Sequence, residues 1–172
     1  MEIQPILSDI QSSLAHNLGM IRWLPPINIH MTLFFLGNVF LVDIPKLTKA
    51  LEDTLNLNHF RASIFKTGVF SSARHPKIFW LGVRRGIKKM MALHEKVKKT
   101  TAPFKKGGQK EHFIPHITLG RAKRSYRKID VLPFLEYVYS PIEFDVNSVA
   151  LYESQLLPYG SEYKVLTTFP LN

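Results

Sequence analysis

The spacing of apolar residues along the chain predicts a mixture of amphipathic helices and short strands. Near the start, Ile6, Ile10 and Leu14 recur at every fourth position, which places them on one helical face. The same kind of pattern predicts helices at residues 5–16, 43–57 and 87–100, and a short one near 126–137. Runs rich in β-branched and aromatic residues predict strands at residues 28–36, 61–70, 77–83, 113–121, 142–152 and 162–169.

The order of these elements is not a regular alternation of strand and helix. The short connection between the strands at 61–70 and 77–83 is typical of antiparallel pairing, and we therefore predict an α+β fold. A chain of 172 residues of which 45% are apolar fits one compact domain, or two small lobes of one domain.

Composition excludes several classes of protein. The chain has no cysteine, so it forms no disulfide and no thiolate zinc site. It has no apolar run long enough to span a membrane, and the sequence after Met1 lacks the regions of a signal peptide. We expect a cytoplasmic monomer with no membrane association and no obligate protein partner.

Positive charge is concentrated in one part of the chain. Residues 84–128 contain 15 Lys and Arg against two acidic residues, whereas the whole chain has a net charge of +10. This segment includes a basic loop predicted at 103–110. Such a concentration of charge attracts polyanions, although for a charged run alone a solvated surface would be the better interpretation. Because this segment contains His116-Ile117-Thr118-Leu119, the second copy of the motif described next, we favour a nucleic acid or nucleotide as substrate.

One short motif occurs twice, as His30-Met31-Thr32-Leu33 and as His116-Ile117-Thr118-Leu119. Side chains two residues apart in a strand point to the same face, so each copy presents an imidazole and a hydroxyl together. For a single copy a structural role would be the better interpretation, because histidine and threonine are common in sheets. The identical spacing of two copies favours a function.

Two imidazoles and two hydroxyls suit the hydrolysis of a phosphodiester. One histidine deprotonates the attacking water, the other protonates the leaving oxygen, and the hydroxyls bind the non-bridging oxygens. Such a site needs no metal or cofactor. His112 and His116 have the spacing of a helical metal pair, but Pro115 lies between them in a predicted strand, so we expect no metal site.

The two motifs and their surroundings resemble the signature of the two-histidine (2H) phosphoesterases. Within that superfamily, the chain is similar to the 2′-5′ RNA ligases, also called RNA 2′,3′-cyclic phosphodiesterases. The similarity extends over nearly the whole chain and includes the segments 22–26, 34–37, 79–83, 113–115 and 151–154.

This resemblance implies a two-lobed LigT-like fold with antiparallel sheets, flanking helices and a pseudo-two-fold arrangement. Residues 1–172 would form a single domain in which each lobe contributes one His-x-Thr strand to a central cleft. Family members usually begin with a short strand ahead of the segment that Glu2–Pro5 resembles. That strand is missing from this sequence, so either the true start lies upstream or one lobe lacks the strand.

The resemblance also implies roles for individual residues. His30 would be the proton donor to the leaving 3′ oxygen and His116 the proton acceptor, so that the product carries a 2′-phosphate. Thr32 and Thr118 would hold the phosphate, and Arg121 matches a family arginine that reaches it. Simple alternation places Arg121 on the face opposite His116 unless a bulge intervenes. Phe113 would stack on a base or pack in the core.

The expected substrate is RNA with a 2′,3′-cyclic phosphate end, such as a tRNA half, or a nucleotide. Joining of RNA ends through a 2′-5′ bond is the reverse reaction and is expected as a side activity. Two alternatives remain open. One is a phosphodiesterase of small cyclic nucleotides or 2′-5′ oligoadenylate, and the other is a non-catalytic protein that binds RNA ends.

Overall fold

The structure, a computed structural model, describes residues 3–16, 18–72, 74–105, 112–123, 129–157 and 160–172. Contacts within the chain divide it into two compact units, each built from three stretches of sequence. The first comprises Met1–Thr32, Ala62–Arg85 and Ile114–Phe144, and the second comprises Leu33–Arg61, Gly86–Phe113 and Asp145–Asn172. Both units combine helix with antiparallel strands, which confirms the predicted α+β class.

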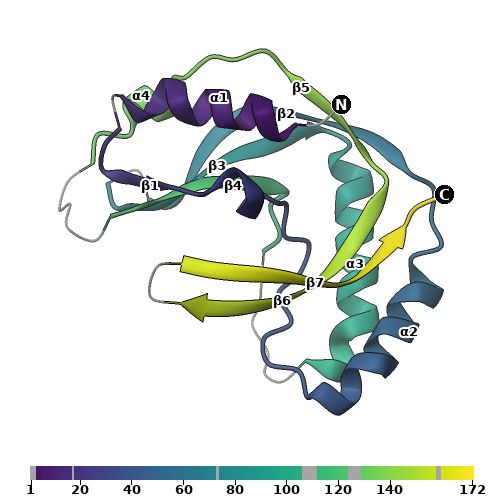
Figure 1. Ribbon diagram of the computed structural model, residues 1–172. Coiled ribbons are helices and arrows are strands. Elements are labelled where there is room, and N and C mark those ends of the chain that lie inside the picture. The colour runs from purple at the N-terminus through teal and green to yellow at the C-terminus, as the bar shows by residue number, and fades with distance from the viewer. Residues whose placement is uncertain (1–2, 17, 73, 106–111, 124–128, 158–159) are drawn as a thin grey trace. The chain divides into compact units, whose positions relative to one another are not determined.

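The first unit is built on a five-stranded sheet with the strand order β1-β4-β3-β2-β5 (Figure 1). Its strands are β1 (Ile21–Trp23), β2 (Phe60–Ser71), β3 (Pro76–Arg85), β4 (His116–Ala122) and β5 (Ile142–Val146). The pairs β1–β4, β4–β3 and β3–β2 are antiparallel. The first two residues of β2 and the last two of β5 belong to the second unit.

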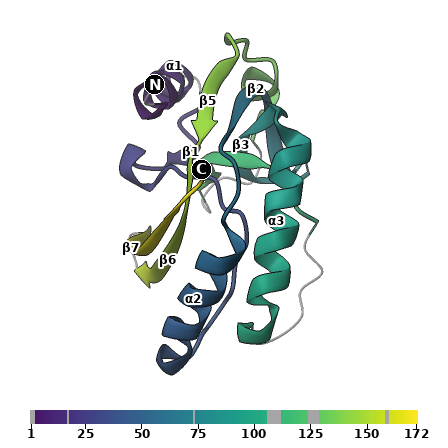
Figure 2. The same ribbon diagram turned by 90° about the vertical axis from the view of Figure 1, so that its right-hand side faces the viewer.

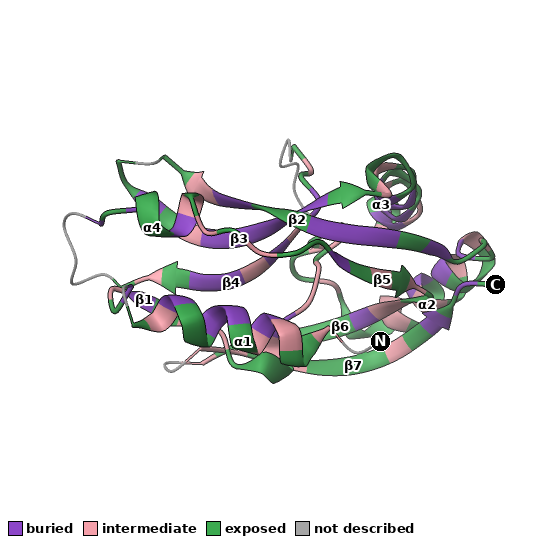
Figure 3. Cartoon of the chain, turned by 90° about the horizontal axis from the view of Figure 1, so that it is seen from above, coloured by how far each residue is buried: buried purple, intermediate pink, exposed green. Residues whose placement is uncertain are grey.

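One face of this sheet is covered by α1 (Gln4–Ala15) and the short helix α4 (Leu132–Leu135). The period of four predicted for α1 is confirmed, because Ile10 and Leu14 are buried against the sheet. Phe79 of β3 meets Phe134 of α4 edge to face, with ring centroids 5.1 Å apart. Buried positions recur along α1, β3 and β4 in Figure 3.

The second unit contains α2 (Ile44–Thr54), α3 (Ile87–Thr101) and a hairpin of β6 (Ser148–Leu157) and β7 (Gly160–Pro170). The two helices lie side by side, as Figure 2 shows, and α2 also contacts β7. Each helix buries one apolar stripe, with Leu47 and Leu51 on α2 and Met90, Leu93 and Val97 on α3. None of the helices in the described part of the chain combines the length and apolar character needed to cross a membrane.

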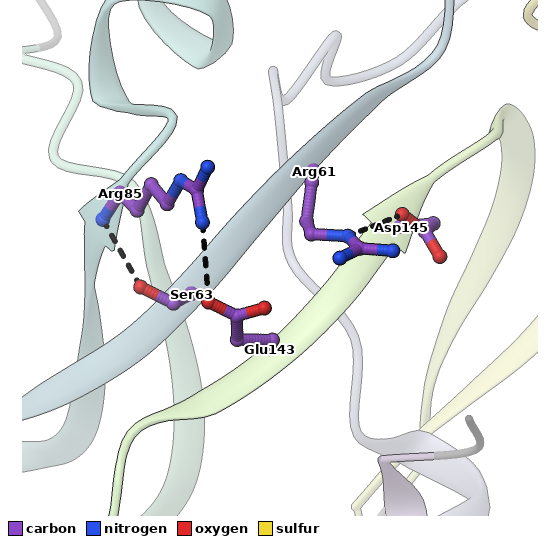
Figure 4. A network of polar contacts seen from close by, with 5 residues as sticks. All are labelled: Arg61, Ser63, Arg85, Glu143 and Asp145. Carbon is purple, nitrogen blue, oxygen red and sulfur yellow. Dashed lines mark hydrogen bonds and ion pairs between the residues drawn. The ribbon is translucent and has the colours of Figure 1, made fainter.

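Exposed ion pairs connect β5 to β2 and to β3 (Figure 4). In the first unit, Arg85 donates from Nη1 to Glu143 Oε1 at 3.2 Å and from its backbone N–H to Ser63 Oγ at 3.3 Å. In the second unit, Arg61 Nε donates to Asp145 Oδ1 at 3.3 Å. Exposed pairs of this kind each contribute about 0–1 kcal/mol, so the sheet depends mainly on its apolar face.

Residues 28–36 do not form the predicted strand. Residues Pro26–Asn28 form a 3-10 turn (η1), and Ile29 then has extended backbone with φ −77° and ψ 118°. No sheet partner is assigned to residues 29–40 among the described residues. Alternating apolar residues favour an extended backbone, but a strand also requires a hydrogen-bonded neighbour, which local sequence does not reveal.

Other predicted boundaries also change. The single strand predicted at 142–152 is divided into β5 and β6, which belong to different sheets, and the three-residue strand β1 was not predicted. Helix 126–137 is reduced to α4, with residues 124–128 outside the described residues. The predicted loop 103–110 begins with the 3-10 turn η3 (Ala102–Phe104), and its residues 106–110 also lie outside them.

Candidate active site

Both His-x-Thr pairs belong to the first unit. His116 and Thr118 lie on β4 and are half-buried, whereas Ile117 and Leu119 alternate with them and are fully buried in the core. This alternation places His116 and Thr118 on the sheet face away from the core. That each lobe contributes one His-x-Thr pair to a central cleft stays a prediction.

The two motif histidines hold the same local hydrogen bond. His30 Nδ1 donates to the carbonyl oxygen of Asn28 at 2.8 Å, and His116 Nδ1 donates to the carbonyl oxygen of Ile114 at 2.6 Å. In each case the acceptor lies two residues earlier in the chain. A carbonyl oxygen only accepts, so the proton of each neutral ring resides on Nδ1, and Nε2 is the nitrogen that gains and loses a proton.

Two aromatic rings enclose His116. Phe70 of β2 approaches it edge to face with ring centroids 4.7 Å apart, and Trp80 of β3 lies at 6.0 Å. Burial lowers the pKa of His116 below its ordinary value of 6.5, against the opposing effect of the hydrogen bond to Ile114. A positive charge on His30 lowers the pKa of His116 further. The pair therefore favours a state in which His116 is neutral.

Two glycines make room for the indole ring of Trp80. A Cβ atom on Gly68 of β2 would lie 2.2 Å from Trp80 Cζ2, and one on Gly82 of β3 would lie 2.9 Å from Trp80 Cζ3. Glycine inside a strand often marks such a close approach. The indole Nε1 is buried and has no hydrogen-bond partner among the described residues, so packing alone holds the ring beside His116.

A β-bulge brings Arg121 onto the face of His116. Trp80 of β3 pairs with Thr118 of β4. Phe79, the residue before Trp80, pairs with Gly120, so β4 contains one extra residue between Thr118 and Gly120. Ile78 then pairs with Arg121 and lies on the same face as Trp80. The bulge therefore resolves the conflict with simple alternation and places Arg121 beside Thr118 on the exposed face.

Phe113 is assigned to the second unit. Its ring stacks on His94 with centroids 4.1 Å apart and planes 6° from parallel. His94 is buried on α3 and donates from Nδ1 to the carbonyl oxygen of Leu33 at 2.7 Å. Stacking of Phe113 on a base stays a prediction.

Sequence reasoning assigned no role to Phe70, and it used Trp80 only as part of a matching segment. The glycines that flank Trp80 in space, Gly68 and Gly82, were the available signal, because each interrupts a predicted strand. In the part of the chain that the structure describes, no group of three or more His, Asp or Glu side chains is arranged to hold a metal ion.

The sequence matches known proteins along most of its length. The family model of the 2′-5′ RNA ligase superfamily matches residues 8–156. The RNA 2′,3′-cyclic phosphodiesterase of Aquifex aeolicus (strain VF5) is 35% identical over 157 residues, which cover 87% of this chain and 81% of that protein. The protein of the same name from Thermotoga maritima is 31% identical over 166 residues, covering 96% and 87%.

Solved structures share the fold. The protein TT0787 of Thermus thermophilus superimposes with a TM-score of 0.79 at 24% identity and covers 98% of this chain and 91% of its own. E. coli LigT complexed with 3′-AMP gives a TM-score of 0.76 at 22% identity and covers 98% and 92%. The predicted LigT-like fold is thereby confirmed. Together with the match of the family model, the sequence relatives establish that the chain belongs to the 2′-5′ RNA ligase superfamily.

Proposed function

We propose that this protein is an RNA 2′,3′-cyclic phosphodiesterase that opens the cyclic phosphate at an RNA end and leaves a 2′-phosphate. One observation carries the proposal: both motif histidines use Nδ1 to bind the carbonyl oxygen two residues earlier, which assigns proton transfer to Nε2 in each ring. The names of the relatives from A. aeolicus and T. maritima support the same activity.

His116 is the proton acceptor in this proposal. Its pKa is lowered by burial and by the charge of His30, so its Nε2 carries a free lone pair at neutral pH. It removes a proton from water as the water oxygen bonds to phosphorus. His30 then donates its Nε2 proton to the 3′ oxygen as the bond between phosphorus and that oxygen breaks. Attack and departure are in line, so the two rings act on opposite sides of the phosphorus.

Thr32, Thr118 and Arg121 bind the phosphate in this mechanism. Thr118 and Arg121 occupy the same sheet face as His116, and their hydroxyl and guanidinium groups donate to the non-bridging oxygens as charge develops there. Protonation and charge neutralisation are then both supplied by side chains, and we propose that hydrolysis proceeds without a metal ion. Joining of RNA ends through a 2′-5′ bond is the reverse reaction and is proposed as a side activity.

Alanine variants of the two histidines test the proposal. His30→Ala and His116→Ala should each lower turnover of an RNA oligonucleotide ending in a 2′,3′-cyclic phosphate by about 10²–10⁴-fold, the range for loss of one acid or base. His75→Ala, which changes an exposed histidine outside the site, is the matched control and should retain activity. Turnover should also survive a chelator. Wild-type rates in either motif variant, with circular dichroism unchanged, would refute the assignment.

A further inference from the structure

Two arginines of the first unit face each other across neighbouring strands. Arg22 of β1 is the register partner of Arg121 of β4, and both side chains are exposed. Register partners in an antiparallel pair lie about 4.5–5.5 Å apart at Cα and point to the same face. Ile21, the neighbour of Arg22 in β1, is buried in the core, so Arg22 also points away from the core.

Two like charges in directly opposite positions destabilise a strand pair. A carboxylate beside the two arginines would offset this repulsion by forming an ion pair, as Glu143 forms one with Arg85 elsewhere in the unit. The side chains of Arg22 and Arg121 form no hydrogen bond or ion pair with any residue in the described part of the chain. The two positive charges of Arg22 and Arg121 are therefore not balanced by an anionic side chain in the described part of the chain. A phosphate group is the anion that paired guanidinium groups bind best.

The sheet register places this pair beside the candidate active site. Along β4, His116 pairs with Gly82, Thr118 with Trp80 and Arg121 with Ile78, all on one face. Arg22 lies on the same face one strand further along, on β1, which is the edge strand of the sheet next to β4. A phosphate held at His116 and Thr118 would leave Arg22 beyond the reacting atoms, where the next group of a longer substrate would lie.

We propose that Arg22 binds the phosphodiester on the 5′ side of the nucleotide that carries the cyclic phosphate, while Arg121, its register partner, donates to the reacting phosphate. The site would therefore select an RNA strand over a cyclic mononucleotide, which has no second phosphate. This inference rests on the proposed function and adds to it the residue that recognises the polymer. Arg22 is a specificity-determining residue in this account and takes no part in proton transfer.

The test compares a dinucleotide ending in a 2′,3′-cyclic phosphate with adenosine 2′,3′-cyclic phosphate. The quantity compared is kcat/KM for the dinucleotide divided by kcat/KM for adenosine 2′,3′-cyclic phosphate. Arg22→Gln should lower this ratio about tenfold or more, as expected for loss of one charge-assisted contact. For a longer single strand, Arg22→Gln should also make the slope of log kcat/KM against log salt concentration less steep by about 0.7. Arg22→Lys should recover part of the ratio, and the matched control Arg84→Gln should leave it unchanged.

An unchanged ratio in Arg22→Gln, or an equal loss on both substrates, would overturn the inference. If the wild-type protein hydrolyses neither substrate, the proposed function fails separately. The inference is then decided by calorimetric titration with a dinucleotide that carries a 3′-terminal phosphate and with adenosine 3′-monophosphate. Weaker binding of only the dinucleotide by Arg22→Gln would support it, and equal binding by wild type and variant would refute it.

Discussion

The indole ring of Trp80 lies directly against the α-carbon of Gly68 on the neighbouring strand. A methyl group on Gly68 would come within 2.2 Å of Trp80 Cζ2, a distance that no packed structure tolerates. Trp80 in turn lies 6.0 Å from the imidazole of His116, measured between ring centroids. The absence of a side chain at position 68 therefore determines the surroundings of the candidate base.

Gly68→Ala should displace the indole ring from its position beside His116. Because the clash involves a buried ring and not a flexible side chain, we expect a loss of about 1–3 kcal/mol in the free energy of unfolding. Chemical denaturation measures this loss, and turnover should fall with it. Gly19→Ala is the control, since a methyl group there meets nothing within 4 Å. Equal stability of the two variants would contradict the packing described.

The shielding of His116 by Phe70 should be visible in the pH dependence of kcat/KM. The base must be neutral, so activity falls on the acid side as His116 becomes protonated. Because burial lowers the pKa of His116, the acid limb should lie below pH 6.5. Phe70→Ser lets water reach the ring, which should raise the pKa and move the limb toward higher pH.

Phe65→Ser provides the control for this shift. Phe65 also lies on β2, but its ring contacts Tyr139 and Arg84 and has no recorded contact with His116. The acid limb should therefore stay in place in this variant. If both serine variants moved the limb equally, the effect would come from the sheet as a whole and not from shielding of the imidazole.

Gln11 connects α1 to the strands that carry the site. This buried side chain donates from Nε2 to the carbonyl oxygens of Leu24 and Leu119, both at 2.9 Å, and Leu119 lies at the bulge that orients Arg121. Gln11→Leu removes the donor and should cost about 1–3 kcal/mol in the free energy of unfolding. Gln4→Leu changes an exposed glutamine of the same helix and should cost much less. Thermal denaturation of both variants decides this point.

His94 should position both motifs through the segments next to them. Its hydrogen bond ends on Leu33, which follows Thr32, and its ring stacks on Phe113, three residues before His116. His94→Phe keeps an aromatic ring but leaves the Leu33 carbonyl without this donor, so we expect kcat to fall while KM changes little. His59→Phe breaks a similar bond from Nδ1 to Asn172 on the surface and should leave kcat unchanged. A change confined to KM in His94→Phe would argue against a positioning role.

A chemistry for the candidate site could be predicted from sequence alone because the pattern that indicates it is local. The His-x-Thr spacing, the period of α1 and the strand at β4 each depend on neighbours within a few residues. The position of Arg121 could not be deduced in this way, since the bulge between Thr118 and Gly120 appears only when β4 is paired with β3.

The shielding of His116 likewise depends on residues far apart in the chain. Phe70 and Trp80 meet the imidazole from two other strands, and the pairing of Arg22 with Arg121 joins residues 99 positions apart. The first motif was misjudged as a strand for the same reason, because pairing is a property of the sheet and not of the segment. Local patterns therefore indicated which groups are candidates for the reaction, and the sheet register determined what surrounds them.

His30 and His116 should open a 2′,3′-cyclic phosphate toward a 2′-phosphate, and the products of one reaction decide whether they do. An RNA oligonucleotide ending in a 2′,3′-cyclic phosphate is incubated with the protein in ¹⁸O-water, and the product is analysed by ³¹P NMR and mass spectrometry. We predict a terminal 2′-phosphate with one ¹⁸O atom, formed by the wild-type protein and lost in His30→Ala and His116→Ala. A 3′-phosphate product, or an end left cyclic after prolonged incubation with folded protein, would contradict the account.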